Sequence, residues 1–440
     1  MDLNLSEKLY LAGVVGAGGA GFPTQIKAKS KVEFVIANGA ECEPLIHKDY
    51  ELMVNFAPKV IDGMKLMMES TGSVKGYFGI KEKNTEAINS ISKQIKDTNI
   101  EMSLLGDFYP AGDEYELVYH TTKRLIPPHG IPLNVGCLVN NVETLLNVSN
   151  AFENIPVTQK FVTVTGLVNK PSSFFVPIGT SFRKLIELAG GTKIKDFGIF
   201  VSGLLMGSLS FDLDESVKKT TAGIIVLPSD HYLINRANRS TKEKNRIGKS
   251  ACDQCSYCTE FCPRYLLGYD VQPHKVMRSL GFTTSGNQIW NQYADLCCSC
   301  GLCSLYACPE DLYPREACDQ SKAEMRKQNQ KYIQTKELKV HPIKEGRRVP
   351  LKQLMKRLDV SKYETKTPFV DLKVDVESVK IYLKQHAGKA AEPIIEIGQE
   401  VKKGDCIADI SKDEVGARVH SSIDGFVKEI TKDYIIITKK

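Results

Sequence analysis

The fold of this chain is decided by two cysteine-rich stretches, CDQCSYCTEFCP at residues 252–263 and CCSCGLCSLYACP at residues 297–309. Each contains three thiols at three-residue spacing and ends with a further thiol directly before a proline. Three closely spaced thiolates can reach three irons of one cubane, and the last thiolate of each run serves the other cluster. Zinc sites usually pair two C-x-x-C knuckles across a longer loop, and nothing in the chain argues for the oxidising compartment that disulfides need. The spacing therefore favours two [4Fe–4S] clusters.

The cysteine pattern is similar to that of bacterial two-cluster ferredoxins. The resemblance implies that one cluster is held by Cys252, Cys255, Cys258 and Cys308, and the other by Cys297, Cys300, Cys303 and Cys262. Four residues rather than three separate Cys303 from Cys308, which departs from the ferredoxin pattern. The remaining cysteines are expected to be ordinary thiols, although Cys298 is close enough to compete as a ligand: Cys42, Cys137, Cys298, Cys318 and Cys406.

Length and composition indicate a globular protein of several domains. A prior of about 150 residues per domain suggests about three or four units in the 440 residues. The net charge of +6 is spread along the chain and not gathered in a basic arm, which argues against a nucleic-acid partner. No apolar run approaches the ~18 to 20 residues that span a bilayer, and the first residues contain no apolar signal region. We therefore expect a reducing, cytoplasmic setting, with any membrane contact made through a partner.

The first 155 residues alternate between expected strands and helices. Strands are predicted at 32–37, 74–80 and 100–105, and helices at 51–70 and 84–96. This alternation is typical of an α/β layer fold. A glycine-rich loop, GAGGAG at 16–21, comes before them, and its backbone can approach a flat ligand or a phosphate closely. No strand precedes this loop, so it does not fit the usual dinucleotide fingerprint.

Three further loops of this region carry polar residues. NGAECEP at 38–44 lies where the first strand ends, and open α/β sheets bind ligands at such positions. YPAGDE at 109–114 follows the third strand, and NNVET at 140–144 opens the last helix. Each stretch alone could be a capping or turn sequence. Together with the glycine loop, they resemble the flavin-bearing, NADH-oxidising subunit of respiratory complex I.

That resemblance implies a Rossmann-like domain that binds FMN and NADH. The residues that match its flavin bed and acidic turn are Gly18, Gly19, Lys27, Asn38, Gly112, Asp113, Glu114, Asn140, Asn141 and Thr144. Phe22 and Glu43 match positions that contact the nicotinamide nucleotide, and Glu41 lies beside the flavin. Three family residues, an arginine, an aromatic residue and an aspartate, are replaced by Ala17, Ala28 and Ala40. These departures leave open whether the chain oxidises NADH itself.

Residues 156–235 are predicted to form a β-grasp domain. Strands are expected at 161–166, 173–178, 198–202 and 223–227, with a helix at 181–189 that Thr180 caps and that stops at two glycines. The stretch GLVNKPSSFFVPIGTSFRKLIELAGG resembles the soluble-ligand-binding β-grasp (SLBB) module, which binds cobalamin in some proteins. The module is also a structural domain in the complex I subunit, so we expect a scaffold here.

The cysteine runs lie in a predicted helical domain at 240–335. A basic stretch at 236–249 and a charged helix at 315–330 flank them. Both are explained by a solvated face, while a positive surface could also dock an acidic redox partner. Residues 336–368 are predicted to be a linker with one short amphipathic helix.

Residues 369–440 follow the barrel-sandwich pattern of biotinyl and lipoyl carriers. Glu414 stands where a carrier has its modified lysine, and Lys412 is two residues out of register, so we expect no lipoylation. The pattern resembles the barrel of the Rnf complex C subunit, which is placed here after the cysteine domain. That domain order is found in the cobalamin reductases of propanediol-utilisation microcompartments.

The whole chain therefore resembles that reductase family. The fold class is multidomain: a Rossmann-like α/β domain (1–155), a β-grasp domain (156–235), a ferredoxin-like two-cluster domain (240–335) and a barrel-sandwich domain (369–440). The resemblance implies that NADH reduces FMN and that electrons pass singly through two [4Fe–4S] clusters to cobalamin, in the cytoplasm or inside a bacterial microcompartment. The cofactors carry this chemistry, so no side-chain base is expected.

Two alternatives remain open at this point. In the same class, a soluble Rnf C-like protein would pass electrons from NADH to ferredoxin or another redox protein. In another class, a corrin- or partner-binding scaffold would carry the clusters without oxidising NADH, which the three alanines permit.

Overall fold

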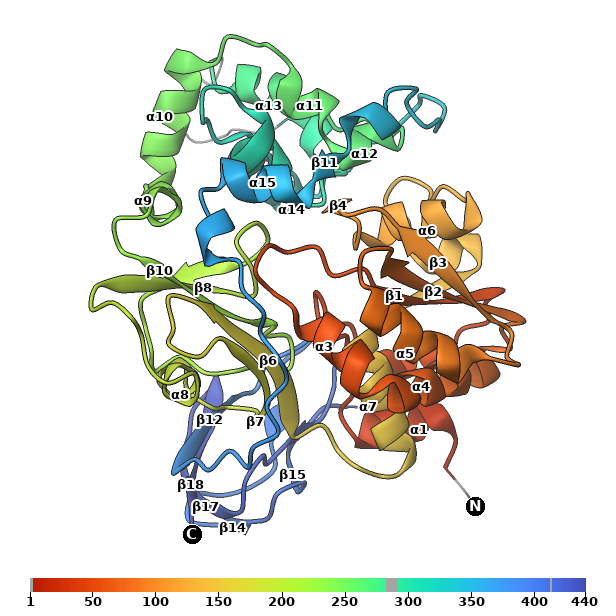
Figure 1. Ribbon diagram of the computed structural model, residues 1–440, viewed down its shortest axis with the longest axis vertical. Helices are drawn as coiled ribbons and strands as arrows, with labels where there is room; N and C mark the ends of the chain where they lie inside the picture. Colours follow the sequence, from red (N-terminus) through yellow and green to blue (C-terminus); the bar gives the residue numbers. More distant parts are fainter. Residues whose placement is uncertain (1–2, 282–290, 412–413) are drawn as a thin grey trace.

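The computed structural model describes residues 3–281, 291–411 and 414–440, and Lys412 lies outside them. Figure 1 shows the first domain (red to orange) beside the β-grasp domain (yellow-green), with the cysteine-rich helical domain at one end of the molecule. The barrel (blue) lies at the opposite end, beneath the β-grasp domain. Among the described residues, no helix has the length and apolar character needed to cross a membrane.

The first domain is built on a parallel sheet of strand order β3-β2-β1-β5. Its strands are β1 (Phe34–Gly39), β2 (Lys75–Lys81), β3 (Ile100–Leu105) and β5 (Cys137–Asn141). Its helices are α1 (Leu5–Leu11), α2 (Thr24–Ala28), α3 (Lys48–Asn55), α4 (Ala57–Thr71), α5 (Thr85–Ile95), α6 (Glu114–Thr122) and α7 (Val142–Phe152). Helices α4 and α7 cross closely at Gly63, where a Cβ would lie 1.8 Å from the carbonyl oxygen of Leu145.

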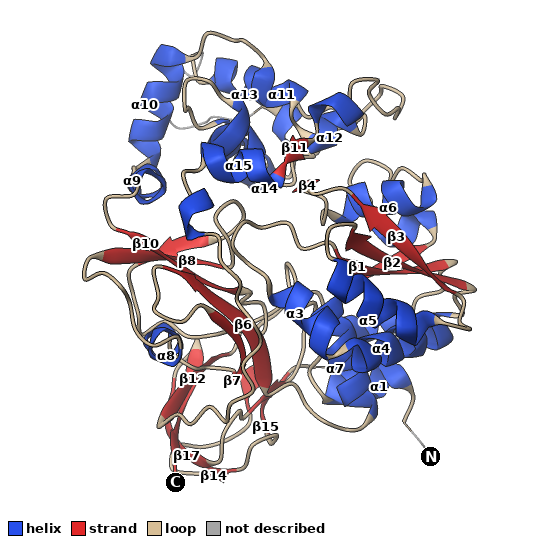
Figure 2. Cartoon of the chain, in the orientation of Figure 1, coloured by secondary structure: helices blue, strands red, loops and turns tan. Residues whose placement is uncertain are grey.

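The single helix expected at 51–70 is wrong, because the structure has two helices, α3 and α4, on either side of Phe56. Pro58 lies in the first turn of α4, and its missing N–H cannot donate to the carbonyl of Val54 as a continuous helix would require. Strand β5 and helix α6 were not among the expected elements. Figure 2 shows the helices of this domain packed over the sheet.

The β-grasp domain has a five-stranded sheet of order β7-β6-β10-β8-β9. Its elements are β6 (Gln159–Gly166), β7 (Ser172–Pro177), α8 (Phe182–Leu188), β8 (Phe197–Val201), β9 (Ser208–Ser210) and β10 (Gly223–Pro228). The expected cap at Thr180 is wrong by one residue: Ser181 Oγ accepts from the N–H of Lys184 at 3.2 Å. The Thr180 hydroxyl is engaged elsewhere, because it donates to the carbonyl of Pro177 at 2.7 Å.

The cysteine-rich domain is made of short helices. They are α9 (Tyr232–Asn238), α10 (Thr241–Ala251), α11 (Tyr257–Glu260), α12 (Pro263–Leu266), α13 (Pro273–Ser279) and α14 (Pro314–Lys327). A π-helical turn spans Cys303–Ala307. Since a π turn accommodates one residue more than an α turn, it absorbs the extra residue between Cys303 and Cys308.

The segment expected as a linker packs against the rest of the protein. Its β11 (Val349–Pro350) pairs antiparallel with β4 (Phe108–Tyr109) of the first domain. Helix α15 (Leu351–Arg357) follows and buries Leu354 in an apolar cluster that also contains Tyr109 and Cys300. Residues 336–368 therefore help to join the first domain to the cysteine-rich domain.

The barrel consists of two small sheets, of order β12-β18-β17-β14 and β13-β15-β16. The strands are β12 (Ser378–Tyr382), β13 (Glu392–Pro393), β14 (Glu400–Val401), β15 (Cys406–Asp409), β16 (Val419–His420), β17 (Gly425–Ile430) and β18 (Tyr434–Lys439). The hydroxyl of Ser422 donates to the carbonyl of Ile178 at 2.6 Å, so the barrel contacts the β-grasp domain directly.

Candidate flavin cavity and cysteine sites

A cavity of about 270 Å³ opens where β1 and β5 end, which is the ligand-binding edge of an open α/β sheet. Ten of the expected site residues line it: Gly18, Gly19, Phe22, Lys27, Asn38, Gly112, Glu114, Asn140, Asn141 and Thr144. The lining also includes residues that sequence reasoning missed, namely the edge of β5 at Cys137–Val139 and the turn at Ile131–Leu133. Those residues are apolar and carry no motif, so only the fold reveals them.

The polar groups of this cavity fit a flavin. Asn140 is 3 % exposed, and neither its side-chain oxygen nor its nitrogen has a partner within the described chain. A ligand that both donates and accepts hydrogen bonds would satisfy it. At Gly19, a Cβ would meet nothing within 4 Å, so the loop leaves open space on the cavity side. The buried ammonium of Lys27 donates to the carbonyl of Val139 at 2.7 Å and offers positive charge to an anionic group. Burial lowers the pKa of Lys27, and the charge of Glu114 opposes that effect.

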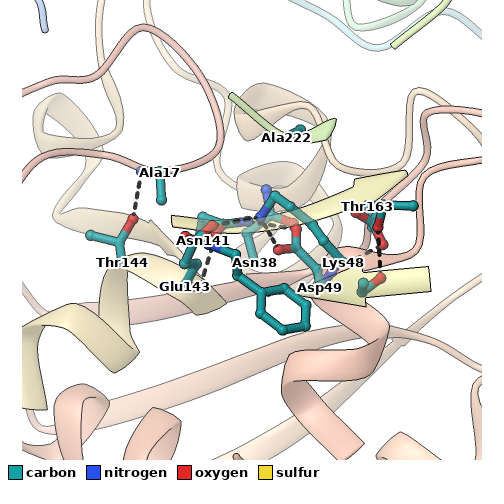
Figure 3. Close-up of polar contacts among 12 residues, drawn as sticks. Ala17, Asn38, Lys48, Asp49, Asn141, Glu143, Thr144, Thr163 and Ala222 are labelled. Carbon is teal, nitrogen blue, oxygen red and sulfur yellow. Dashed lines mark hydrogen bonds and ion pairs between the residues drawn. The ribbon is translucent and has the colours of Figure 1, made fainter. Parts of the chain in front are cut away.

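A buried charge network holds the cavity wall in place (Figure 3). Lys48 Nζ lies 2.5 Å from Asp49 Oδ1 and 3.0 Å from Glu143 Oε2, and Lys160 Nζ lies 2.5 Å from the same Glu143 oxygen. Asn141 donates to Asp49 at 2.7 Å, while Lys160 donates to the carbonyl of Ala17 in the glycine loop at 3.1 Å. Although burial alone would raise it, the two lysines hold the pKa of Glu143 below its usual value. The network therefore ties the glycine loop to α3, α7 and β6.

Three of the expected site residues do not line the cavity: Glu41, Glu43 and Asp113. The carboxylate of Glu41 accepts from the N–H of Asp49 at 3.1 Å, and burial together with the Asp49 charge raises its pKa well above the usual value. Asp113 caps α6 and forms a two-pronged ion pair with Arg264, at 2.8 and 3.1 Å. The carboxylates of Glu41 and Asp113 therefore contact other protein groups and stabilise the structure around the cavity.

The carboxylate of Glu43 points to the β-grasp domain. It accepts from three successive backbone N–H groups, of Leu204 (3.0 Å), Leu205 (3.1 Å) and Met206 (2.8 Å). Charge-assisted bonds of this kind are stronger than neutral ones, so Glu43 fixes the 204–206 loop against the first domain. A role of Glu43 toward a nicotinamide nucleotide stays a prediction.

Four of the eight expected cluster thiols surround one cavity, while the ligand set of each cluster stays a prediction. One cavity is lined by Cys252, Cys255, Cys258 and Cys308, which we call the outer site. Burial raises the pKa of Cys258 to about 12, and the nearby charges of Cys308, Cys252 and Cys255 add to the effect. Such shifts are those of the free thiols, and iron would hold them as thiolates.

The other four thiols are Cys262, Cys297, Cys300 and Cys303, which we call the inner site. Burial, then the charge of Cys297, raises the pKa of Cys262. The pKa of Cys303 is raised by burial and by the charges of Cys297, Cys258 and Cys262. Cys308, the last thiol of the second run, therefore lies with the first three thiols of the first run. The matching placement of Cys262 stays a prediction from the crossover pattern.

Two further thiols contact the inner site. Cys318 of α14 is fully buried and hydrogen-bonded to Cys297, which lowers the pKa of Cys297 to about 7. Cys298 is hydrogen-bonded to Cys300. Both are therefore neighbours of ligand candidates, and competition of Cys298 as a ligand stays a prediction.

The barrel contacts the glycine loop and the helix that follows it. The N–H of Ala387 donates to the carbonyl of Gly21 at 3.1 Å, and Gln25 Nε2 donates to the carbonyl of Gly416 at 2.8 Å. Lys219 of the β-grasp domain joins the two segments. Its side-chain nitrogen donates to the carbonyl of Gly13 (2.7 Å) before the glycine loop and to the carbonyl of Arg418 (2.6 Å) in the barrel. No sequence signal pointed to Lys219, because its partners are backbone atoms of two distant segments.

Comparisons with known proteins match every part of this architecture. Family models match at residues 9–150 (Nuo51 FMN-binding domain), 161–196 (SLBB domain), 251–313 (4Fe-4S dicluster domain) and 357–440 (RnfC barrel sandwich hybrid domain). The expected fold class is thereby confirmed, and the chain carries an FMN-binding domain and a [4Fe–4S] dicluster domain.

Curated relatives match over nearly the whole chain. Cobalamin reductase PduS of Salmonella typhimurium is 37 % identical over 439 residues, covering 99 % of this chain and 96 % of that protein. Cobalamin reductase PduS of Citrobacter freundii matches equally, at 37 % over 439 residues with the same coverage. The C subunit of the Na(+)-translocating ferredoxin:NAD(+) oxidoreductase complex of Acetobacterium woodii is 34 % identical over 275 residues, covering 60 % of this chain and 59 % of that protein.

Proposed function

The chain belongs to the PduS cobalamin reductase family, and on that premise we propose that it passes electrons from NADH through FMN and two [4Fe–4S] clusters to cobalamin. The observation that carries the proposal is the flavin cavity with the unpartnered Asn140, built in the same chain as a cavity lined by four cysteines. Relatives of nearly equal length with the same domains support it.

When bound, FMN would supply a hydride acceptor for NADH, and the clusters would supply one-electron carriers toward the corrin cobalt. The protein's own residues bind and orient. Gly19 leaves space for a flat ring, and Gly18 lets the loop approach Asn141, where a Cβ would lie 2.9 Å from the side chain. Asn140 offers the ring a donor and an acceptor. Phe22, 38 % exposed at the cavity, presents a ring face for a nucleotide to cover.

The three alanine replacements do not alter the flavin cavity itself. Ala17, Ala28 and Ala40 are each at most 2 % exposed, and all are packed in the protein outside the cavity lining. The N–H of Ala17 donates to Thr144 Oγ1 at 2.9 Å, which ties this point of the loop to α7. The proposal therefore retains NADH as the donor.

Anaerobic titration of the reconstituted protein with NADH tests this proposal. We expect the flavin absorbance to bleach, then the cluster absorbance, and added cob(III)alamin to be reduced. If NADH leaves the flavin absorbance unchanged, the oxidoreductase proposal fails and the scaffold alternative stands. If the flavin bleaches and ferredoxin is reduced while cob(III)alamin is not, the chain is an Rnf C-like reductase, an alternative that the similarity to the Acetobacterium woodii protein supports.

The proposal extends to where the protein works. We place it beside a corrinoid-dependent enzyme, inside a bacterial microcompartment, by analogy with the reductases that it resembles. Purified shells from a strain that makes such compartments should contain the chain. Recovery of all the protein outside the shells would refute this placement and leave the electron transfer proposal untouched.

A further inference from the structure

The inner site is tied to the loop that lines the flavin cavity. Tyr109 is 1 % exposed, and its hydroxyl donates to the carbonyl of Cys300 at 2.6 Å. Three residues further along the chain, Gly112 lines the cavity. One hydrogen bond and a short piece of backbone therefore connect the cavity wall to a thiol of the inner site.

A second link runs from the neighbouring residue of the same loop. Asp113 follows Gly112 and pairs with Arg264, which stands two residues after Cys262. The two side chains are only 16 % and 9 % exposed. Planar, two-pronged pairing fixes orientation as well as distance, so the Cys262 end of the inner site is held against the cavity loop.

Cys42 makes a third link, in the packed interior. Its sulfur lies 3.5 Å from the position of a Cβ at Gly112, and it packs against the apolar cluster that contains Tyr109 and Cys300. The cavity wall and the inner site are thus joined through packed protein atoms. The loop anchored by Glu43 also approaches this site at Gly301, where a Cβ would lie 3.1 Å from the carbonyl oxygen of Leu205.

The outer site has a different environment. The residues around its thiols all lie within 253–314 of the cysteine-rich domain, and none comes from the flavin domain among the residues that line the cavity. Cys255 is exposed to solvent, whereas three of the four inner thiols are buried. The two sites adjoin, because the charge of Cys258 influences Cys303.

We infer that electrons leaving the flavin cavity reach the inner site first and leave the protein from the outer site, next to Cys255. This order rests on the proposed function and refines it. Loss of one electron would oxidise the reduced flavin by one unit, and gain of that electron would reduce the inner cluster by one. The inner cluster would be reoxidised as the outer one is reduced. The acceptor, a corrin or a protein that presents one, therefore docks on the face around Cys255.

A measurement on the unaltered protein tests the geometry without NADH. The clusters are reduced with dithionite, and their spin relaxation is followed by electron paramagnetic resonance while a dysprosium chelate is added to the solvent. We expect the outer cluster to relax faster with the chelate and the inner cluster to change less. The Cys255→Ala variant identifies the outer signal, because the substitution removes or alters that signal alone. A larger effect of the chelate on the inner cluster would overturn the inference.

Rapid freezing after mixing with NADH tests the order itself. In Cys255→Ala, the remaining signal should rise in the same fast phase as in the unaltered protein. In Cys262→Ala, the outer cluster should still be reduced by dithionite but lose its fast phase with NADH. A fast phase that survives in Cys262→Ala, or that disappears in Cys255→Ala, refutes the order.

Failure of the order and failure of the proposed function give different results. If NADH reduces nothing in the unaltered protein, the donor assignment has failed. The flavin is then reduced by light with a sacrificial donor, and the same two variants report the order from there.

Discussion

Replacing Asn140 with alanine is expected to weaken FMN binding without destabilising the apoprotein. The side chain is buried and has no partner for its oxygen or nitrogen within the described chain. Two hydrogen bonds to a flavin at about 0.5 to 1.5 kcal/mol each give about 1 to 3 kcal/mol, or roughly 5- to 150-fold in Kd. In the apoprotein the same unpartnered atoms cost free energy, so their removal should leave the thermal midpoint unchanged or higher.

Asn141→Ala is the matched control, because the neighbouring amide is fully engaged. It accepts from the N–H of Glu143 as the cap of α7 and donates to Asp49. Loss of an N-cap costs about 1 kcal/mol, so this variant should lower the apoprotein midpoint. Quenching of flavin fluorescence measures Kd, and circular dichroism of the flavin-free protein measures the midpoint. An unchanged Kd in Asn140→Ala, or a midpoint as low as that of Asn141→Ala, would refute the reasoning.

Three other predictions follow from contacts between domains and within the cysteine sites. Arg264→Met leaves Asp113 unpaired and should cost about 3 kcal/mol of stability, since breaking a buried pair costs about 3 to 5 kcal/mol and this one is slightly exposed; the thermal midpoint reports it, with Arg264→Lys intermediate. Burial lowers the pKa of Lys219 from 10.5 to about 7, so between these values the unfolded chain binds the extra proton and stability rises with pH. Lys219→Met should therefore lower the slope of unfolding free energy against pH by about 1.4 kcal/mol per pH unit. Thermal midpoints measured from pH 7 to 9 check this. Cys308→Ala should lose about half of the iron, and full retention of iron would assign the ligand role to Cys298 or Cys318.

Local patterns predicted much of the fold and of the candidate site. The spacing from Cys252 to Cys262 predicts a cluster site from sequence alone, because three ligands of one cluster lie within a few residues of one another. Strand β3 was expected at its observed bounds for the same kind of reason, since alternation is a local property. The glycine loop and Asn140 were found through resemblance and lie on one cavity.

Contacts between distant segments were beyond such reasoning. The ion pair between Asp113 and Arg264 joins residues that are 151 positions apart in the sequence. From sequence alone, Asp113 could equally be a helix cap, and it does cap α6. Glu43 was interpreted as a nucleotide contact because it matches such a position in the complex I subunit that the first domain resembles. Its carboxylate is nevertheless taken by the backbone of Leu204–Met206, which no pattern in either segment announces.

The contacts between the barrel and the glycine loop join segments that are synthesised far apart in time. Gly21 is made among the first residues on the ribosome, and Ala387 and Arg418, which hold this loop directly or through Lys219, are made near the end. Domains fold largely in the order of their synthesis, so the sheet of the first domain can form early while its loop waits for the last segment. The contacts between the glycine loop and the barrel can therefore form only after residues 387 to 418 have been synthesised.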